Sequence, residues 1–232
     1  MPAQQTLIEQ VERDGFALVP DVLSPESCDE LLAAFAFVQN AAENRAASMR
    51  NVLQRVPQVR ALCESPSILP LLESVLGAGC FSVRAILFDK TPNANWKVVW
   101  HQDLTIAVRE KREVEGFGPW SVKDGVTHVQ PPVRVLERML TLRLHLDNCD
   151  ENNGPLRVLR GSHQSGKLCS SAIAEWRARQ AEEVCTSPRG GALLMRPLML
   201  HASSQAKEPR HRRVLHIEWA NEELADGLLW HS

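Results

Sequence analysis

The hydrophobic periodicity of the chain changes at Phe81, and this change constrains the fold more than any other feature of the sequence. Before Phe81, apolar residues recur every three to four positions, which indicates amphipathic helices. From Phe81 onward, apolar and polar residues alternate in short runs, which indicates half-buried strands. The expected helices cover residues 5–13, 24–42, 52–62 and 67–76, and the main expected strands cover 81–88, 96–103, 139–146 and 212–219.

This order of elements predicts a mainly β protein with flanking helices. The N-terminal helices occupy about residues 5–76, and an antiparallel jelly-roll core occupies about 81–220, in one domain over residues 1–232. Smaller expected elements are a strand at 16–20, a helix at 172–183 and two strands that meet at a bend within 192–201. Residues 104–138 break the alternation with charges, glycines and prolines, so they are expected to form a long functional lid or binding loop.

Charge and composition exclude two classes of partner. Of the 232 residues, 44% are hydrophobic and 23% are charged, and the formal net charge is -2. A nucleic-acid binder or a protein bound to an anionic membrane would need a strong basic excess, so neither activity is expected. The first residues lack the charged and apolar regions of a signal peptide, and no apolar run approaches the roughly 18 residues of a spanning helix. We therefore expect a cytoplasmic location.

The cysteines and the missing tyrosines narrow the chemistry. The six cysteines include no C-x-x-C pair, which favours reduced structural thiols over a zinc knuckle or a disulfide framework; they are Cys28, Cys63, Cys80, Cys149, Cys169 and Cys185. The chain has no tyrosine, so a mechanism that needs a tyrosine acid, base or radical is excluded.

A candidate metal site lies in the strand that ends at Asp103. In a strand, His101 and Asp103 share one face while Trp100 and Gln102 point to the other. Iron(II) oxygenases bind their metal with two histidines and one carboxylate and leave three coordination positions open. His201 is the candidate second histidine. The H-x-D pattern alone also arises by chance, so a surface or hydrogen-bonded core role for His101 stays open at this point.

Arg212 follows His201 by eleven residues and adds a second requirement of the same chemistry. A 2-oxo acid chelated by iron needs a fixed cation for its far carboxylate. Arginine suits that task because its planar guanidinium forms two parallel charge-assisted hydrogen bonds. Arg213 is adjacent, but neighbouring strand residues face opposite ways, so only one of the two arginines can enter a barrel.

These residues occur in an ordered set of short motifs that resembles the phytanoyl-CoA dioxygenase family of iron(II)- and 2-oxoglutarate-dependent oxygenases. The motifs are Trp100-His101-Gln102-Asp103, Asn153-Gly154-Pro155-Leu156, Gly161-Ser162-His163, and His201-Ala202-Ser203 followed by Arg212-Arg213. The resemblance begins near Asp14-Gly15-Phe16 and runs almost to the end of the chain. It implies a double-stranded β-helix, a cupin-like form of the jelly roll.

The resemblance also implies a set of roles. His101, Asp103 and His201 would bind Fe(2+) and form the catalytic centre, and Arg212 and Ser203 would bind 2-oxoglutarate. Gln102 and Trp120 occupy positions that in relatives lie near the co-substrate. The implied reaction consumes O2 and 2-oxoglutarate, releases succinate and CO2, and oxidises a small molecule. Because halogenating relatives have a small residue in place of Asp103, hydroxylation or another oxidative outcome is expected rather than halogenation.

One departure from the family pattern concerns a turn. Relatives commonly have proline before Gly-Ser-His, whereas this chain has Arg160. The change bears on the rigidity of the turn and leaves the metal ligands untouched. His163 in this turn is expected to form a structural hydrogen bond.

Several other polar residues have alternative interpretations. Thr141 and Arg143 share one face of the expected strand 139–146 and either contact the co-substrate or substrate, or face solvent. By strand parity Lys97 shares the His101 face and either reaches an anionic substrate or is exposed; Lys90 lies at the other side of the same strand pair. Trp120 and Lys123, from the 104–138 connection, are expected to shape the substrate pocket.

Two other functions remain open from the residues. The same three metal ligands would serve a cupin-like lyase or isomerase that uses no 2-oxo acid, and a non-catalytic descendant would bind a ligand only. Arg212 separates the first alternative from the oxygenase, because only the oxygenase needs a buried cation for a carboxylate. The substrate and the oligomeric state are not predicted.

Overall fold

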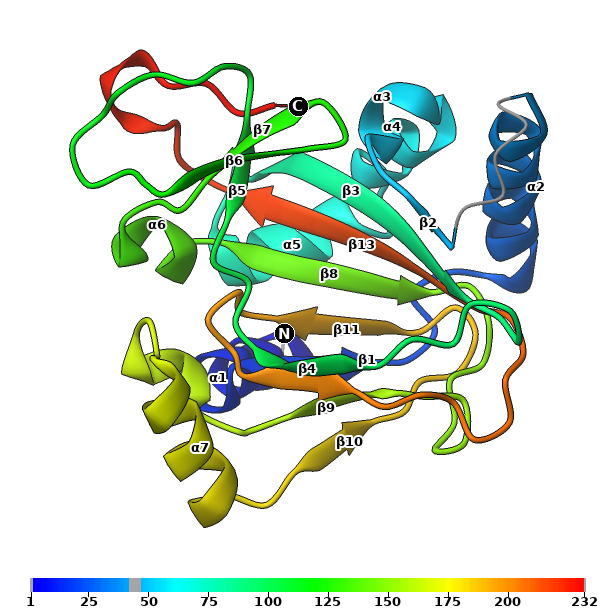
Figure 1. Ribbon diagram of the computed structural model, residues 1–232. Helices are drawn as coiled ribbons and strands as arrows, with labels where there is room; N and C mark the ends of the chain where they lie inside the picture. Colours follow the sequence, from blue (N-terminus) through cyan, green and yellow to red (C-terminus); the bar gives the residue numbers. More distant parts are fainter. Residues whose placement is uncertain (1, 42–46, 232) are drawn as a thin grey trace.

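The computed structural model describes residues 2–41 and 47–231, and Figure 1 shows their arrangement. The N-terminal part is helical, as expected, and its helices are α1 (Pro2–Asp14), α2 (Pro25–Ala41), α3 (Val52–Arg55), α4 (Pro57–Cys63) and α5 (Leu69–Leu76). The expected single helix at 52–62 is two helices. The reason is Pro57, which disfavours helical backbone at the preceding residue, and Val56 accordingly has φ -128° and ψ 90°.

A six-stranded antiparallel sheet forms one wall of the core. Its strand order is β1-β11-β8-β13-β3-β2, which brings together strands far apart in the sequence. The strands are β1 (Phe16–Val19), β2 (Ser48–Met49), β3 (Phe81–Lys90), β8 (Leu140–His145), β11 (Ala192–Met195) and β13 (Arg212–Ala220).

A four-stranded sheet forms the facing wall, with the order β10-β9-β12-β4. Its strands are β4 (Val98–His101), β9 (Leu156–Val158), β10 (Glu183–Cys185) and β12 (His201–Ser203). β3 and β4 follow one another in sequence but belong to different sheets, so they are not the two arms of a hairpin. β10 was not expected, because the helix assigned to 172–183 is shorter and ends with α7 (Ser170–Arg179). The two facing antiparallel sheets form the expected jelly roll.

The 104–138 connection is not an irregular loop, so that expectation was wrong. It folds into a third, three-stranded sheet of order β5-β7-β6 and a short helix, namely β5 (Ile106–Val108), β6 (Trp120–Lys123), β7 (Val126–Val129) and α6 (Val133–Glu137). Asp124 and Gly125 join β6 to β7 and both have positive φ, 49° and 77°. An Asp-Gly pair is a strong signal for a two-residue hairpin turn, and this signal was present in the sequence.

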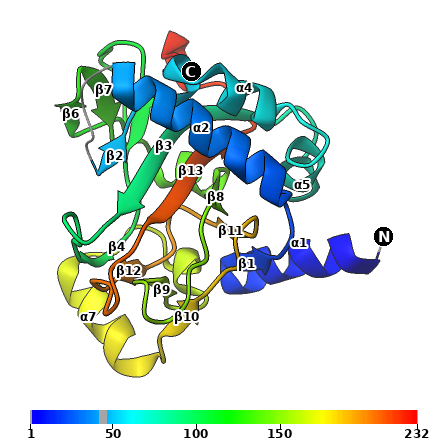
Figure 2. The same cartoon turned by 90° about the vertical axis from the view of Figure 1, so that its right-hand side faces the viewer.

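Strand alternation separates an apolar outer face from a polar inner face. Leu142 and Leu144 of β8, with Leu215 and Ile217 of β13, belong to one buried cluster with residues of α2 to α5. Figure 2 shows these helices lying across the outer side of the six-stranded sheet. The alternate residues of β8 and β13 therefore face the other sheet, and they include the polar side chains that build the site.

Two 3-10 turns complete the fold, η1 (Ser162–Ser165) and η2 (Ala225–Gly227). Within the described part of the chain, no helix combines the length and the apolar character needed to cross a membrane. All six cysteines are free, and only Cys169 is exposed.

Candidate active site

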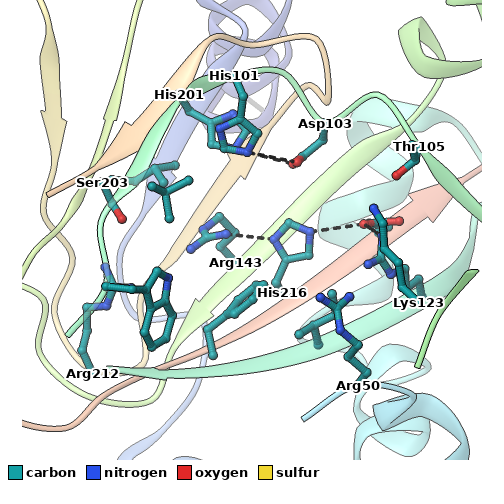
Figure 3. Close-up of a pocket in the computed structure, with 17 residues that line it drawn as sticks. Arg50, His101, Asp103, Thr105, Lys123, Arg143, His201, Ser203, Arg212 and His216 are labelled. Carbon is teal, nitrogen blue, oxygen red and sulfur yellow. Dashed lines mark hydrogen bonds and ion pairs between the residues drawn. The ribbon is translucent and has the colours of Figure 1, made fainter. Parts of the chain in front are cut away.

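Three side chains from two neighbouring strands of the smaller sheet converge at one point. His101 ends β4 and is the register partner of His201, which begins β12. Their ring centroids are 4.2 Å apart. Asp103 follows β4, and its two carboxylate oxygens lie 3.6 Å from His101 Nε2 and 3.7 Å from His201 Nε2. Figure 3 shows the three side chains pointing toward one another.

Hydrogen bonds orient both histidines for metal binding. His101 Nδ1 donates to the carbonyl of Val99 at 2.8 Å, and His201 Nδ1 donates to the carbonyl of Met199 at 2.9 Å. Because the Nδ1 atoms carry the protons, each Nε2 has a free lone pair, which is the arrangement found in metal-ligating histidines. One ligand atom from each of the three residues lies within 4.8 Å of the others. The donor set and its orientation fit iron(II).

The protonation states of His201 and Asp103 favour the same role. Burial lowers the pKa of His201 to about 4, so its imidazole is neutral near pH 7. Burial opposes ionisation of Asp103, but the adjacent His201 and His101 hold the pKa of its carboxyl well below the usual range. A neutral imidazole and an ionised carboxylate are the forms that bind a metal.

These three residues lie on the wall of a cavity of about 190 Å³ between the sheets. The cavity has two cationic ends, with Arg212 and Ser203 at one and Arg50 and Lys123 at the other (Figure 3). The lining residues are Arg50, Arg84, Ile86, Phe88, Trp96, Val98, His101, Asp103, Thr105, Lys123, Arg143, Leu156, His201, Ser203, Arg212, His216 and Glu218.

Two buried cations without an acidic partner among the described residues lie at the inner end of the cavity, Arg212 in its lining and Lys90 behind Ser203. Arg212 is 4% exposed and donates to the carbonyl of Gly154, while its Nε has no partner. Lys90 is 1% exposed and donates to Ser203 Oγ at 3.1 Å and to the carbonyl of Ser204 at 2.6 Å. Buried charges are costly unless they are paired, so this end is built to receive an anion.

The lowered pKa of Lys90 supports the interpretation of this end as an anion site. Burial and the nearby Arg212 lower the pKa of Lys90 to about 7. Burial also lowers the pKa of Arg212. Gly154 passes close to this cluster, because a Cβ at that position would lie 2.9 Å from the carbonyl oxygen of Ser204. The Asn-Gly-Pro motif therefore supplies the one residue type that allows the close approach.

A chain of polar contacts crosses the floor of the cavity from β8 to β3. Arg143 donates to His216 Nδ1 at 2.9 Å, so Nδ1 is the acceptor and the ring proton lies on Nε2. His216 Nε2 lies 3.4 Å from Glu218 Oε1, and Arg84 donates to the same oxygen at 2.9 Å. Burial and Arg212 lower the pKa of Arg143 to about 10, which leaves it charged near neutral pH.

The structure does not bring every expected residue to the cavity. Gln102 points away from it, as the alternation predicts, and bonds to the backbone of Leu198, Gly166 and Leu168. Trp120 packs in the cluster around the three-stranded sheet. Thr141 is buried on the same strand face as Arg143, but it does not line the cavity.

The expectation that Lys97 shares the His101 face was wrong, because Lys97 is exposed and lies outside the cavity. The register of β4 against β12 shifts between the His101–His201 and Val98–Ser203 pairs, which are three residues apart on β4 and two on β12. Such a β-bulge reverses the parity of the residues before it, so Val98 takes the inward position.

Arg160 has a defined role in place of the usual proline. Its guanidinium forms ion pairs with Asp14, which is 2% exposed, and with Glu183. His163 donates through Nε2 to the carbonyl of Glu12 at 3.1 Å, which confirms its structural role. These contacts hold the end of α1 against the turn before η1.

Arg50, Arg84, Thr105 and Glu218 line the cavity but were not singled out as site residues from the sequence. For two of them a signal was available. Glu218 is on the same alternating face as Arg212 and His216, and Arg84 is its register partner on β3. Arg50 lies in the segment between β2 and α3, which has no periodicity that would predict its direction.

The sequence was compared with families of known proteins. The model of the phytanoyl-CoA dioxygenase (PhyH) family matches residues 11–214. The chain belongs to the phytanoyl-CoA dioxygenase family. The matched segment contains His101, Asp103, His201 and Arg212, and the membership confirms the resemblance inferred from the motifs. No curated protein matches the sequence.

Solved structures share the fold of this family member. The non-heme α-ketoglutarate-dependent carbocyclase SnoK from nogalamycin biosynthesis has a TM-score of 0.74 and 15% identity, over 96% of this chain and 88% of SnoK. EctD from S. alaskensis, solved with 2-oxoglutarate and 5-hydroxyectoine, has a TM-score of 0.72 and 19% identity, over 95% of this chain and 76% of EctD. AviO1 from Streptomyces viridochromogenes Tue57 has a TM-score of 0.67 and 21% identity, over 94% of both chains. These similarities confirm the jelly-roll core.

Proposed function

We propose that this protein is an iron(II)- and 2-oxoglutarate-dependent dioxygenase that oxidises a small molecule, with hydroxylation as the expected outcome. The observation that carries the proposal is the combination, in one cavity, of an oriented His-Asp-His cluster and a buried cationic end that has no described acidic partner. The family and the similar structures support it, since SnoK and SnoN are α-ketoglutarate-dependent and EctD has been solved with iron.

Each group in the cavity has a task under this proposal. His101, Asp103 and His201 would hold the metal, and Arg212 and Ser203 would bind the far carboxylate of 2-oxoglutarate, with Lys90 behind them. Bound iron(II) and 2-oxoglutarate, with O2, supply an oxidant that can remove hydrogen from a substrate carbon, while 2-oxoglutarate becomes succinate and CO2. The chain fixes the direction of each ligand atom through the Nδ1 hydrogen bonds and neutralises the co-substrate charge.

Arg143 is a further candidate for contact with the co-substrate, because its guanidinium lines the cavity between the two ends. For Gln102 we propose a positioning role behind the metal ligands. We propose a small-molecule substrate, a cytoplasmic location, and no nucleic-acid or membrane partner.

The cupin-like lyase or isomerase is the second candidate, and Arg212 decides between the two. We expect Arg212→Ala to reduce kcat/KM for conversion of 2-oxoglutarate to succinate about 30-fold or more, because truncating one partner of a buried charge contact costs about 2–5 kcal/mol. The uncoupled reaction measures this without a known substrate. Arg213→Ala is the matched control, since Arg213 bonds to Asp147 outside the cavity. An equal loss in both variants, or succinate formation that does not respond to Arg212→Ala, would contradict the proposal.

A further inference from the structure

The outer end of the cavity contains cations that binding of 2-oxoglutarate does not explain. Arg50 follows β2, Arg84 lies on β3 and Lys123 ends β6, so three separate elements each contribute one positive charge. Figure 3 shows Arg50 and Lys123 at the end opposite Arg212 and Ser203, with Thr105 and Asp103 beside them. A group held here would extend along the cavity toward the metal ligands.

The acidic residues near this end balance only part of its charge. Glu218 pairs with Arg84 at 2.9 Å and with His216, both inside the cavity. Asp124 pairs with Arg50 at 2.7 Å, but Asp124 is 67% exposed. A pair with one exposed partner contributes little and is easily exchanged for another anion. Within the described chain, Lys123 forms no ion pair.

The two arginines also act on Lys123 directly. Lys123 is exposed, and partial burial, Arg84 and Arg50 lower its pKa while Glu218 and Asp103 act in the opposite direction. The net lowering indicates that positive charge predominates around its ammonium. Asp124 is the residue next to Lys123, in the turn of the β6–β7 hairpin, and it pairs with Arg50. The three-stranded sheet therefore places a cation at this end of the cavity.

The charges at the inner end and at the metal ligands have other partners under the proposed function. Arg212 and Lys90 face the far carboxylate of 2-oxoglutarate, and Asp103 faces the metal. One excess positive charge then remains at the outer end, on Lys123. Because the whole cavity has a volume of only about 190 Å³, below the roughly 300–1,000 Å³ of drug-sized ligand sites, little room remains beside the co-substrate.

We propose that the primary substrate is a small acid whose carboxylate or phosphate binds between Lys123, Arg50 and Arg84 while its reacting carbon lies toward His101, Asp103 and His201. This rests on the proposed function and adds the chemical class of the substrate. Neutral and cationic analogues of the same shape bind more weakly, because they lack the negative charge that Lys123, Arg50 and Arg84 attract.

The test uses the protein loaded with iron(II) and saturating 2-oxoglutarate without oxygen. The charge-transfer band of the chelated oxo acid reports the metal and co-substrate, and its perturbation reports occupancy of the remaining space. The probes are linear monocarboxylates of two to eight carbons, their primary amides, and alkyl phosphates of the same lengths. Comparison of the carboxylate and phosphate series identifies which acid is preferred.

We expect the best acid to bind at least tenfold more tightly than its amide, with an affinity that falls as ionic strength rises, since exposed charges are screened by salt. Lys123→Met and Arg50→Gln should each reduce the affinity for the acid about three- to tenfold and leave the affinity for the amide unchanged. Lys97→Met is the matched control, because Lys97 is an exposed lysine outside the cavity. The unperturbed band in each variant shows that the variant is folded and loaded.

Equal binding of acid and amide would overturn the inference, as would the absence of binding by any acid, or an equal loss in Lys97→Met. If the band itself never forms, the proposed function fails instead. The two failures are therefore distinguishable in one experiment.

Discussion

Lys90 shows how a single residue can be unfavourable for the fold and useful for the site. Its ammonium is buried beside Arg212, lies 5.6 Å from the Trp96 ring centroid and has no acidic partner among the described residues. Burial and Arg212 lower its pKa to about 7, whereas a lysine in the unfolded chain keeps a pKa near 10.4. Between these values the unfolded state binds more protons, so this residue makes the stability of the unliganded protein rise with pH.

In the unliganded protein, burial and Arg212 favour the neutral amine of Lys90. A dianion bound beside Lys90 favours the charged ammonium instead. We therefore expect the affinity for 2-oxoglutarate to be highest below about pH 7 and to weaken as the pH rises above it, up to tenfold per pH unit, as the free protein loses this proton. Lys90→Met should flatten the pH profile and weaken binding at pH 6.5 about tenfold. Isothermal titration across pH 6–9 with the Mn(II)-loaded protein measures both.

Lys97→Met serves as the control for that titration, since it removes an exposed lysine. The Lys90 variant should also gain thermal stability by a few degrees, because a buried unpaired charge is replaced by an apolar side chain. A pH profile that is unchanged in Lys90→Met would rule out this residue as its origin.

At the scale of elements, Gln102 connects the metal-binding strand to its surroundings. Its amide nitrogen donates to the carbonyls of Leu198 at 2.7 Å and Gly166 at 2.8 Å, and its oxygen accepts from Leu168 N at 2.8 Å. These bonds fix the backbone between His101 and Asp103 from the side opposite the cavity.

We expect Gln102→Ala to lower the free energy of unfolding by about 2–3 kcal/mol, because buried backbone groups lose their partners. It should also weaken metal binding about 10- to 100-fold, the usual effect of losing an outer partner of the ligands. Urea unfolding and metal titration measure the two effects. Gln164→Ala, which removes an exposed hydrogen bond to Glu12, is the control and should change neither. Unaltered metal affinity in Gln102→Ala would contradict the positioning role.

Arg160 connects α1 to the turn before η1. Asp14 is 2% exposed, and its hydrogen bonds with Arg13 and Arg160 lower the pKa of its carboxyl. A lowered folded-state pKa stabilises the protein above the unfolded value near 3.9 and the effect is lost as the pH falls through the folded value. Arg160→Ala should therefore cost about 1–2 kcal/mol at pH 7 and less at pH 3.

Urea unfolding at the two pH values measures the difference. Arg179→Ala is the matched control, because Arg179 is 80% exposed and its pair with Glu175 lies within one helix. A loss of stability in Arg160→Ala that is the same at both pH values would argue against the ion pair with Asp14 as its cause.

Most of the elements could be predicted from the sequence because they rest on local periodicity. The meeting of His101, Asp103 and His201 followed from the order of the motifs and is found in the structure. Strand alternation puts His216 and Glu218 on the same inner face as Arg212, and it correctly turned Gln102 away from the cavity. The same rule failed for Lys97, because a bulge in the pairing of β4 with β12, between Val98 and His101, shifts the register. Bulges depend on pairing between distant strands, which a single strand does not encode.

Packing between segments far apart in the sequence also explains the other differences between the prediction and the structure. Lys90 ends a strand, and nothing in its neighbours indicates that Ser203 and Trp96 will bury it. Arg50 reaches the cavity only because β2 pairs with β3 at the sheet edge. The Asp124-Gly125 turn, by contrast, was a local signal within a segment that was interpreted as a loop.

At the scale of the whole molecule, the fold joins segments about one hundred residues apart into one centre. His101 and Asp103 come from the first half of the core, while His201, Ser203 and Arg212 come from its end. The helices cover the outer face of the larger sheet, and the three-stranded sheet closes one end of the cavity. The central claim is that this centre binds iron(II) and 2-oxoglutarate together.

Anaerobic titration of the metal-free protein with iron(II) and 2-oxoglutarate tests that claim most directly. We expect a weak visible metal-to-ligand charge-transfer band that saturates at one equivalent of iron, disappears in His101→Ala and weakens in Arg212→Ala. Tight metal binding without the band would contradict the claim and favour a cupin-like enzyme that uses no oxo acid. Failure to bind iron at all would contradict both enzymatic functions.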